Sequence, residues 1–298
     1  MNMLAPDRPS PALLSWAERL REDGFCVIPN LVPPAQMAAL DEELRPRFDA
    51  TPFCDGYFNG YRTKRFHGLL KRSRGAAALV LNPTILAIAE AFLLPFCEKL
   101  QLNLTQAVEI HPGELSQIPH RDENMWPAKD RSTEYLINIM WPLSDYTPAN
   151  GSTRLWRGSH RQPDLTSPTP PEAMSASMKP GDALVFLGST LHGAGANESD
   201  TIRRGVLVSY CLGWLKPYEN MWLTYPPDIA QSFPRPLQDL VGYAQHKPNL
   251  GNYDGQCPSV LLGAQVPDIL ATTDAVLPAH EEALRAYAAR ERSEKGKE

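Results

Sequence analysis

The hydrophobic and polar residues of this chain change their period partway along its length. In the first third, apolar residues recur every three or four positions, which is the spacing of amphipathic helices. The pattern predicts helices over residues 10–23, 34–48 and 83–95. Between the first two, residues 25–28 form a short apolar run that is typical of a strand.

After residue 100, apolar residues alternate with polar ones, which is the period of a strand with one buried face. Such runs cover residues 101–110 and 134–141. Residues 183–187 and 205–212 are further β-rich runs, and turn-forming clusters separate the four. Helices followed by several strands predict an α+β fold whose sheets form a sandwich or barrel. At the far end, residues 278–295 predict a polar helix on the outside of the protein.

Residues 50–75, the lid segment, follow neither period. Aromatic residues are interleaved there with lysines and arginines, and glycines lie between them. Long segments of this kind often form lids or binding loops. A solvated loop whose aromatic residues pack on the core explains the pattern equally well. The aromatic residues concerned are Phe53, Tyr57, Phe58, Tyr61 and Phe66.

Composition narrows the classes of function. The 298 residues carry a formal net charge of −5, which gives no electrostatic reason to expect a nucleic-acid partner. The longest apolar run, residues 85–96, is too short for a membrane span and contains Glu90. No basic and then apolar segment opens the chain, so we expect no secretory signal. Five cysteines without a C-x-x-C pair favour a reduced, cytoplasmic protein.

One pair of residues indicates metal chemistry. His120 and Asp122 are two positions apart, so on an extended strand both side chains would leave the same face. A further histidine would complete the 2-His-1-carboxylate set that suits non-haem Fe(II). His192, just after the strand 183–187, is the stronger candidate, and His160 is the alternative. Taken alone, an H-x-D triplet also fits ordinary surface residues.

A pair of arginines suggests a co-substrate. If 2-oxoglutarate chelates the metal, its far carboxylate requires a buried cation, and arginine binds carboxylates through two parallel hydrogen bonds. Arg203 lies eleven residues after His192, at the start of the strand 205–212. Of Arg203 and Arg204, we expect one to lie at a surface-facing strand end.

Several motifs occur in a distinctive order along the chain. They are Glu22-Asp23-Gly24-Phe25, His120-x-Asp122, Asn150-Gly151-Ser152-Thr153, Gly158-Ser159-His160, Pro180-Gly181-Asp182 and His192-Gly193 with Arg203. In this order they resemble the phytanoyl-CoA dioxygenase family of Fe(II)- and 2-oxoglutarate-dependent oxygenases. The resemblance covers about residues 20–225. It implies a double-stranded β-helix core (a jelly roll, cupin-like) with flanking helices. No repeat or clear second domain interrupts the chain, so we expect one domain over residues 1–298 that ends in a helical extension over about 226–298.

The resemblance also implies roles for single residues. His120, Asp122 and His192 match the iron ligands, whereas His160 matches a structural position. Arg203 matches the arginine that binds 2-oxoglutarate. Gln117 and Thr153 match positions that hydrogen-bond this co-substrate, and Asn138 is a further candidate for that role or a satisfied core residue.

The sequence departs from the family pattern in places. Ala194 stands where the phytanoyl-CoA enzyme has a serine that contacts the co-substrate, and Arg65 or Lys64 can supply a basic contact instead. The surroundings of Trp214 are more similar to bacterial and fungal branches of the family, which leaves the acyl-CoA substrate open. Candidate substrate residues are Tyr57, Phe58, Arg65, Phe66, Trp214 and Asn220. Their aromatic content suits an apolar or natural-product-like small molecule.

The predicted activity is hydroxylation or desaturation of an unactivated C–H bond, with O2 consumed and succinate and CO2 released. By resemblance, Asp122 favours this outcome, because halogenases of this fold carry a small residue in its place. Two alternatives remain at this point: a cupin-like metal dioxygenase that does not use 2-oxoglutarate, and a non-catalytic binding protein of the same fold. We expect neither a nucleic-acid nor a membrane partner, and the sequence does not indicate an oligomeric state.

Overall fold

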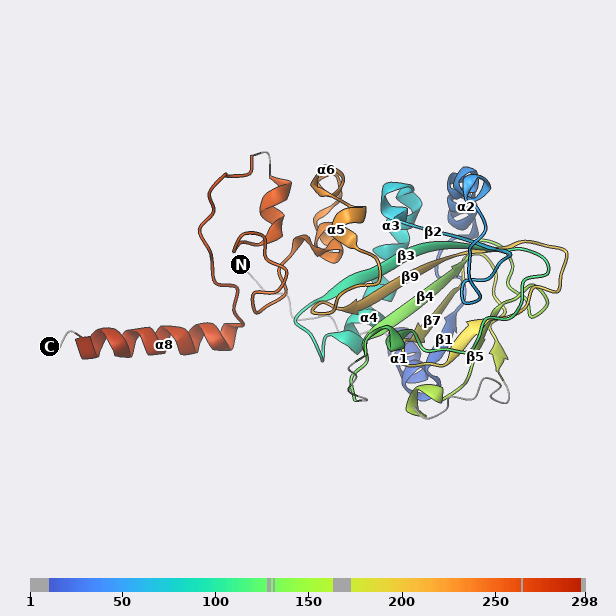
Figure 1. Ribbon diagram of the computed structural model, residues 1–298. Coiled ribbons are helices and arrows are strands. Elements are labelled where there is room, and N and C mark those ends of the chain that lie inside the picture. Colours follow the sequence, from blue (N-terminus) through green and yellow to red (C-terminus); the bar gives the residue numbers. More distant parts are fainter. Residues whose placement is uncertain (1–10, 128–129, 131, 163–172, 264, 296–298) are drawn as a thin grey trace. The chain divides into compact units, whose positions relative to one another are not determined.

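The structure is a computed structural model that describes residues 11–127, 130, 132–162, 173–263 and 265–295. The chain forms two compact units, the first ending at Tyr225 and the second beginning at Pro226. The first unit contains the helices and strands that the hydrophobic pattern predicts (Figure 1). In it, helices and antiparallel sheets combine into the predicted α+β fold.

The first unit is built on a six-stranded antiparallel sheet in the order β1-β7-β4-β9-β3-β2. Side chains alternate between its two faces, as the sequence period requires. On β4, for example, Asn138 and Met140 share one face, and Ile137 and Ile139 share the other. The strands are β1 (Phe25–Ile28), β2 (Thr63–His67), β3 (Leu100–Ile110), β4 (Leu136–Pro142), β7 (Ala183–Leu187) and β9 (Arg203–Leu212).

A smaller sheet faces the inner side of the large one. It has the order β6-β5-β8, with β5 at Thr153–Leu155, β6 at Met174–Ser175 and β8 at His192–Ala194. A buried apolar cluster fills the space between the sheets, with Leu155 from β5 against Met140, Leu184 and Phe186 from the large sheet. The two sheets therefore form a sandwich.

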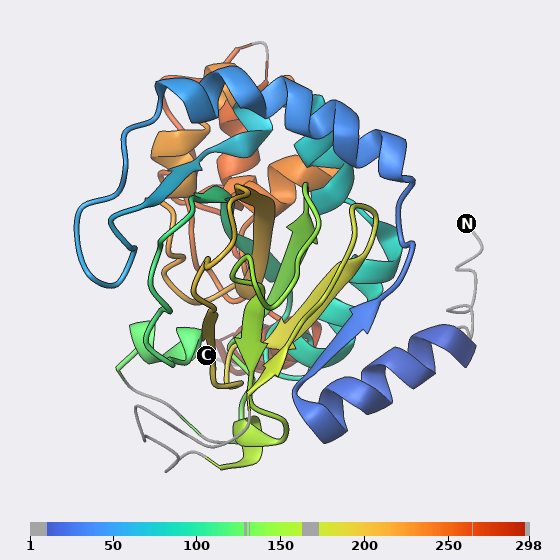
Figure 2. The same ribbon diagram turned by 90° about the vertical axis from the view of Figure 1, so that its right-hand side faces the viewer.

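Helices cover the outer face of the large sheet. α4 contacts β3, β4 and β9, and the Tyr210 hydroxyl of β9 donates to the Val80 carbonyl at the end of α3. α1 and α2 lie well apart, at opposite edges of the first unit (Figures 1 and 2). The helices are α1 (Pro11–Asp23), α2 (Pro34–Ala50), α3 (Arg74–Val80), α4 (Pro83–Leu93) and α5 (Met221–Thr224), with short 3-10 turns η1 (Leu69–Lys71), η2 (Asp122–Met125) and η3 (Ser159–Arg161). Ser10, the expected start of the first helix, lies outside the described residues.

The lid segment is more ordered than the sequence predicts. Residues 63–67 form β2, which pairs with β3 from Thr63 opposite Ile110 to His67 opposite Gln106. The strand forms because the open edge of β3 supplies backbone partners. The hydrophobic pattern of residues 63–67 does not predict this pairing, because it depends on a distant strand. Only the residues before β2 form the expected loop.

The second unit consists of short helices and one long one. These are α6 (Pro227–Ala230), α7 (Arg235–Gln238), η4 (Asp239–Tyr243), η5 (Pro258–Leu262) and α8 (Pro278–Lys295). α8 buries none of its residues and matches the predicted polar helix. No single helix in the described part of the chain is long and apolar enough to cross a membrane. The bent pair α3 and α4, broken by 45°, passes that test by length and composition only.

Candidate active site

Three side chains meet as a set of potential metal ligands. The ligand atoms of His120, Asp122 and His192 lie within 4.8 Å of one another. His120 Nε2 is 3.3 Å from Asp122 Oδ1, and His192 Nε2 is 3.6 Å from Asp122 Oδ2. Two imidazoles and one carboxylate around a common point are the donor set that suits non-haem iron.

The backbone brings the two histidines together. His120 and His192 form an isolated antiparallel bridge, in which each N–H donates to the other residue's carbonyl at 2.9 Å. Arg121 is extended (φ −118°, ψ 131°), so His120 and Asp122 point to the same side as predicted. The extended stretch ends sooner than expected, because Asp122 already begins η2.

Each histidine is held by the carbonyl two residues before it. His120 Nδ1 lies 2.9 Å from the Ile118 carbonyl, and His192 Nδ1 lies 3.0 Å from the Thr190 carbonyl. Because a carbonyl can only accept, Nδ1 carries the proton in both rings. Nε2 therefore presents a lone pair toward Asp122, as a metal ligand requires.

Protonation states also suit a metal. Burial raises the pKa of Asp122, but the neighbouring His192 and His120 and the hydrogen bond from Asn138 outweigh it and bring that pKa to about 2. Burial lowers the pKa of His192 to about 4. At pH 7 the site thus holds an ionised carboxylate beside a neutral imidazole, the forms in which these groups bind metals.

The three ligands share a pocket of about 110 Å³ with a buried arginine. Arg203 is 2% exposed, lies 4.4 Å above the Tyr146 ring and donates to the Gly151 carbonyl. Its Nε has no hydrogen-bond partner among the described residues. Burial lowers the pKa of Arg203, yet a guanidinium stays charged at neutral pH. The pocket therefore contains a cation that is free to bind an anion.

Arg65 supplies a second cation to the same pocket. Its Nη1 donates to Gln106 Oε1 at 3.0 Å, and its buried Nε has no partner among the described residues. Arg203 and Arg65 come from β9 and β2, on either side of β3. A buried guanidinium from Arg203 and a partly buried one from Arg65, beside three metal ligands, suit a small dianion.

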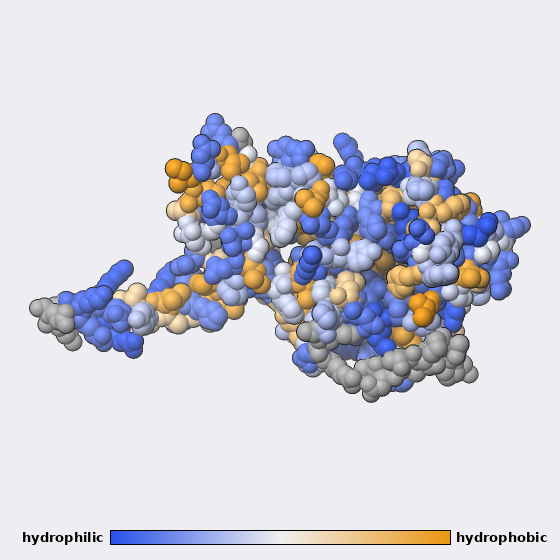
Figure 3. Space-filling view, in the orientation of Figure 1, coloured by the Kyte–Doolittle hydropathy of each residue, from blue (hydrophilic) through white to orange (hydrophobic). Residues whose placement is uncertain are grey.

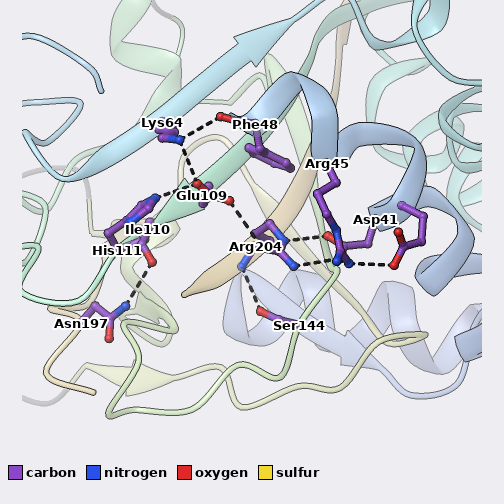
Figure 4. Close-up of polar contacts among 11 residues, drawn as sticks. Asp41, Arg45, Phe48, Lys64, Glu109, Ile110, His111, Ser144, Asn197 and Arg204 are labelled. Atoms are coloured by element: carbon purple, nitrogen blue, oxygen red, sulfur yellow. Dashed lines mark hydrogen bonds and ion pairs between the residues drawn. The ribbon is translucent and has the colours of Figure 1, made fainter. Parts of the chain in front are cut away.

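Arg204 and Lys64, the chain neighbours of these arginines, have other partners (Figure 4). Arg204 pairs with Asp41 of α2 at 2.7 Å and with Glu109 of β3 at 3.5 Å. Lys64 lies 3.6 Å from Glu109 and donates to the Phe48 carbonyl. Lys64 is therefore not available as the alternative basic contact, and Arg204 is paired with carboxylates on the helix-covered face instead of ending in solvent.

Two of the predicted co-substrate residues, Gln117 and Thr153, line the pocket. Gln117 Oε1 accepts from the Ala194 N–H at 3.2 Å, and its Nε2 donates to the Phe58 carbonyl at 3.2 Å. Asn138 does not line the pocket. Its Nδ2 donates to Asp122 Oδ2 at 2.9 Å, so it contacts a ligand of the site instead.

The loop before β2 forms a chamber of about 440 Å³ next to the pocket. Tyr57 and Phe58 line it, and Phe58, Arg65 and Gln117 border both spaces. The Phe58 ring meets the His120 ring edge-on at 4.8 Å between centroids. In the space-filling view, hydrophobic residues on the visible face lie in small groups among hydrophilic ones (Figure 3).

Three of the predicted substrate residues lie elsewhere. Phe66 is 5% exposed and contacts the Phe48 ring, on the face of β2 opposite Arg65. Trp214 donates to the Phe96 carbonyl, and the Asn220 side chain caps α5. None of them lines the pocket or the chamber. The prediction for Phe66 is wrong, because the alternation along β2 turns it toward the core.

His160 and Arg121 lie outside the pocket and donate hydrogen bonds to backbone carbonyls of other segments. His160 Nε2 donates to the Arg21 carbonyl, in keeping with the predicted structural role. Arg121 is buried and donates to the carbonyls of Ser189, Ser159 and Gln162. It thus ties the His120 segment to the turn that carries His192. The sequence offers no sign of this role beyond an arginine placed between two ligands.

Comparisons with known proteins agree with this site. The model of the phytanoyl-CoA dioxygenase (PhyH) family matches residues 20–205. Dioxygenase cdmA of Talaromyces verruculosus is 32% identical over 241 residues, which cover 76% of this chain and 81% of that protein. Dioxygenase olcK of Penicillium canescens is 30% identical over 245 residues, or 78% and 81% of the two chains.

Solved structures share the fold. The α-ketoglutarate-dependent epimerase SnoN from nogalamycin biosynthesis has a TM-score of 0.58 at 22% identity, over 70% of this chain and 86% of its own. HygX from Streptomyces hygroscopicus, solved with nickel, 2-oxoglutarate and hygromycin B, has a TM-score of 0.54 at 18% identity, over 69% and 89%. At these identities the likeness concerns the fold alone.

The fold and site together define an oxygenase of the Fe(II)- and 2-oxoglutarate-dependent class. The chain belongs to the phytanoyl-CoA dioxygenase family, since the family model covers more than half of it. The predicted class, an Fe(II)- and 2-oxoglutarate-dependent oxygenase, is confirmed. It is therefore preferred over a dioxygenase that does not use 2-oxoglutarate and over a non-catalytic binding protein.

Proposed function

We propose that this protein hydroxylates or desaturates an unactivated C–H bond of a small organic molecule, while 2-oxoglutarate and O2 are converted to succinate and CO2. One observation carries the proposal: three metal ligands share a pocket with Arg203, a buried cation whose Nε lacks a partner among the described residues. Burying such a cation costs free energy unless an anion pairs with it.

The residues of the pocket divide the work between them. His120, Asp122 and His192 would hold Fe(II), which when bound supplies the oxidative chemistry at the C–H bond. Arg203 would bind the far carboxylate of 2-oxoglutarate, and Arg65 would face the carboxylate at the metal end. Gln117 and Thr153 would orient the co-substrate from the other side of the pocket. Asp122 leaves no room for a halide, in keeping with hydroxylation or desaturation.

We further propose that the two facing sheets are the double-stranded β-helix of this family, with residues 1–298 acting as one catalytic domain. The substrate would enter through the chamber under Tyr57 and Phe58. An apolar, natural-product-like molecule fits its aromatic lining. Among similar proteins, SnoN is solved with nogalamycin RO and HygX with hygromycin B, which supports a small-molecule substrate. The five unpaired cysteines support a reducing, cytoplasmic setting.

Succinate release tests the proposal. Purified protein with Fe(II), ascorbate, 2-oxoglutarate and a panel of candidate natural products should form succinate faster with at least one of them. Asp122→Ala, which removes a ligand, is the control and should stay at background. Equal succinate formation by the wild type and this variant would contradict the proposal.

A further inference from the structure

We infer that Asn138 is a positioning residue that keeps Asp122 bound to the metal through a single oxygen. The inference rests on the proposed metal site and adds a residue that does not itself touch the metal or the pocket. Asn138 lies in the middle of β4, opposite Phe186 of β7 and Ser209 of β9. It is 1% exposed and shares the inner face of the sheet with Met140.

The direction of the contact follows from its chemistry. A carboxylate only accepts hydrogen bonds, so the Asn138 amide nitrogen must face Asp122 Oδ2, 2.9 Å away. The other carboxylate oxygen, Oδ1, lies toward His120 Nε2 at 3.3 Å. Oδ2 lies 3.6 Å from His192 Nε2, so each carboxylate oxygen has a histidine nearby, but only Oδ2 also accepts a hydrogen bond from the Asn138 amide.

The amide oxygen of Asn138 argues against the view that this residue serves to stabilise the fold. Asn138 Oδ1 is buried and has no hydrogen-bond partner among the described residues. An unsatisfied buried acceptor costs about 1–3 kcal/mol. On the face of the sheet that Asn138 shares, its neighbours Met140 on β4 and Phe186 on β7 are buried and apolar. An apolar side chain would suit this strand better, so the amide is best explained by its contact with Asp122.

The coordination requirement explains why that contact matters. Two histidines and one carboxylate oxygen leave three of six positions open on Fe(II). A chelating co-substrate would need two of these and O2 the third. If both oxygens of Asp122 bound the metal, only two positions would remain. By holding Oδ2, Asn138 would keep the last position available.

Two substitutions remove the amide with different side-chain volumes, Asn138→Val and Asn138→Ala. The probe is Co(II) added to metal-free protein, because its visible absorption reports coordination number without turnover. We expect Co(II) affinity to fall by about 10- to 100-fold in both variants, as is typical when a ligand loses its supporting hydrogen bond. We also expect a changed Co(II) spectrum, and an unchanged or higher melting temperature for the metal-free Asn138→Val protein.

The matched control is Ser209→Ala. Ser209 is buried opposite Asn138, and its hydroxyl accepts from Asn103 without contacting Asp122. This variant should change stability but leave the Co(II) spectrum as in the wild type. Wild-type Co(II) affinity and spectrum in both Asn138 variants would overturn the inference, even if their stability fell. A wild-type protein that bound no Co(II) would overturn the proposed metal site first and this inference with it.

Discussion

Arg203 and Arg204 are neighbours on β9, yet their guanidinium groups lie on opposite faces of the large sheet. Arg203 faces the pocket with the metal ligands, whereas Arg204 pairs with Asp41 and Glu109 beneath α2. The strand period of two produces this separation. Substitutions at the two positions should therefore have different effects, even though the residues are adjacent.

Arg203→Gln should weaken 2-oxoglutarate binding while the fold is kept. Hydrogen bonds to charged groups contribute about 1.5–3 kcal/mol, which corresponds to roughly 10- to 100-fold in affinity. The dissociation constant can be measured by calorimetry on the metal-loaded protein without O2. Arg204→Gln is the control and should lower the melting temperature but leave co-substrate affinity near the wild type. If Arg204→Gln weakened 2-oxoglutarate binding and Arg203→Gln did not, the assignment of Arg203 to the co-substrate would be wrong.

Asp122→Ala should abolish both tight metal binding and substrate-coupled succinate formation. The variant retains two histidines, which present only nitrogen ligands and leave the charge of a divalent ion uncompensated. Equilibrium dialysis against Fe(II) without O2 measures the first effect, and chromatography of succinate measures the second. Full turnover by this variant would contradict the assignment of the ligands.

Arg121→Gln should destabilise the protein and loosen the metal site. Its guanidinium donates to carbonyls on two separate segments, those of Ser159 and Gln162 on one and that of Ser189 on the other. Each buried carbonyl left without a donor costs about 1–3 kcal/mol. We expect a loss of about 2–4 kcal/mol in urea unfolding, together with weaker Fe(II) binding, since Ser189 precedes His192 by only three residues. Arg121→Lys should lose less. Unchanged stability in Arg121→Gln would contradict the proposed role of these hydrogen bonds in joining the two segments.

Glu134 should make stability depend on pH. Burial raises the pKa of Glu134 to about 8, although hydrogen bonds from Ser189 act against it. A raised pKa means that the folded state prefers the protonated carboxyl. Its stabilising contribution is complete below pH 4.5 and is lost as the pH rises toward 8. Glu134→Gln mimics the protonated form, so its melting temperature should fall less than that of the wild type between pH 5 and 9. Parallel profiles would contradict this.

Much of this arrangement follows from sequence pattern. The alternation over residues 101–110 and the β-rich run over residues 205–212 predict β3 and β9. On a strand, neighbouring residues such as Arg203 and Arg204 face opposite sides. The spacing of His120 and Asp122 predicts a shared side because the residue between them is extended. Both relationships depend on local geometry, which a strand period describes.

Other features depend on contacts between distant segments. β2 forms only because β3 offers an edge, so the basic run at residues 63–67 resembles a loop. The contacts of Arg121 span 38 to 68 residues of sequence, and that of Asn138 with Asp122 spans 16. The prediction of Phe66 and Trp214 as substrate residues rests on aromatic content alone. Aromatic content does not distinguish the wall of a pocket from the hydrophobic core.

The central claim is that His120, Asp122, His192 and Arg203 form one site for Fe(II) and 2-oxoglutarate. The most direct test is a titration without O2, in which Fe(II) and then 2-oxoglutarate are added to the protein. The account predicts a weak visible metal-to-ligand charge-transfer band that saturates at one equivalent of each and is absent in Asp122→Ala. Fe(II) binding to the wild type without any such band on addition of 2-oxoglutarate would contradict it.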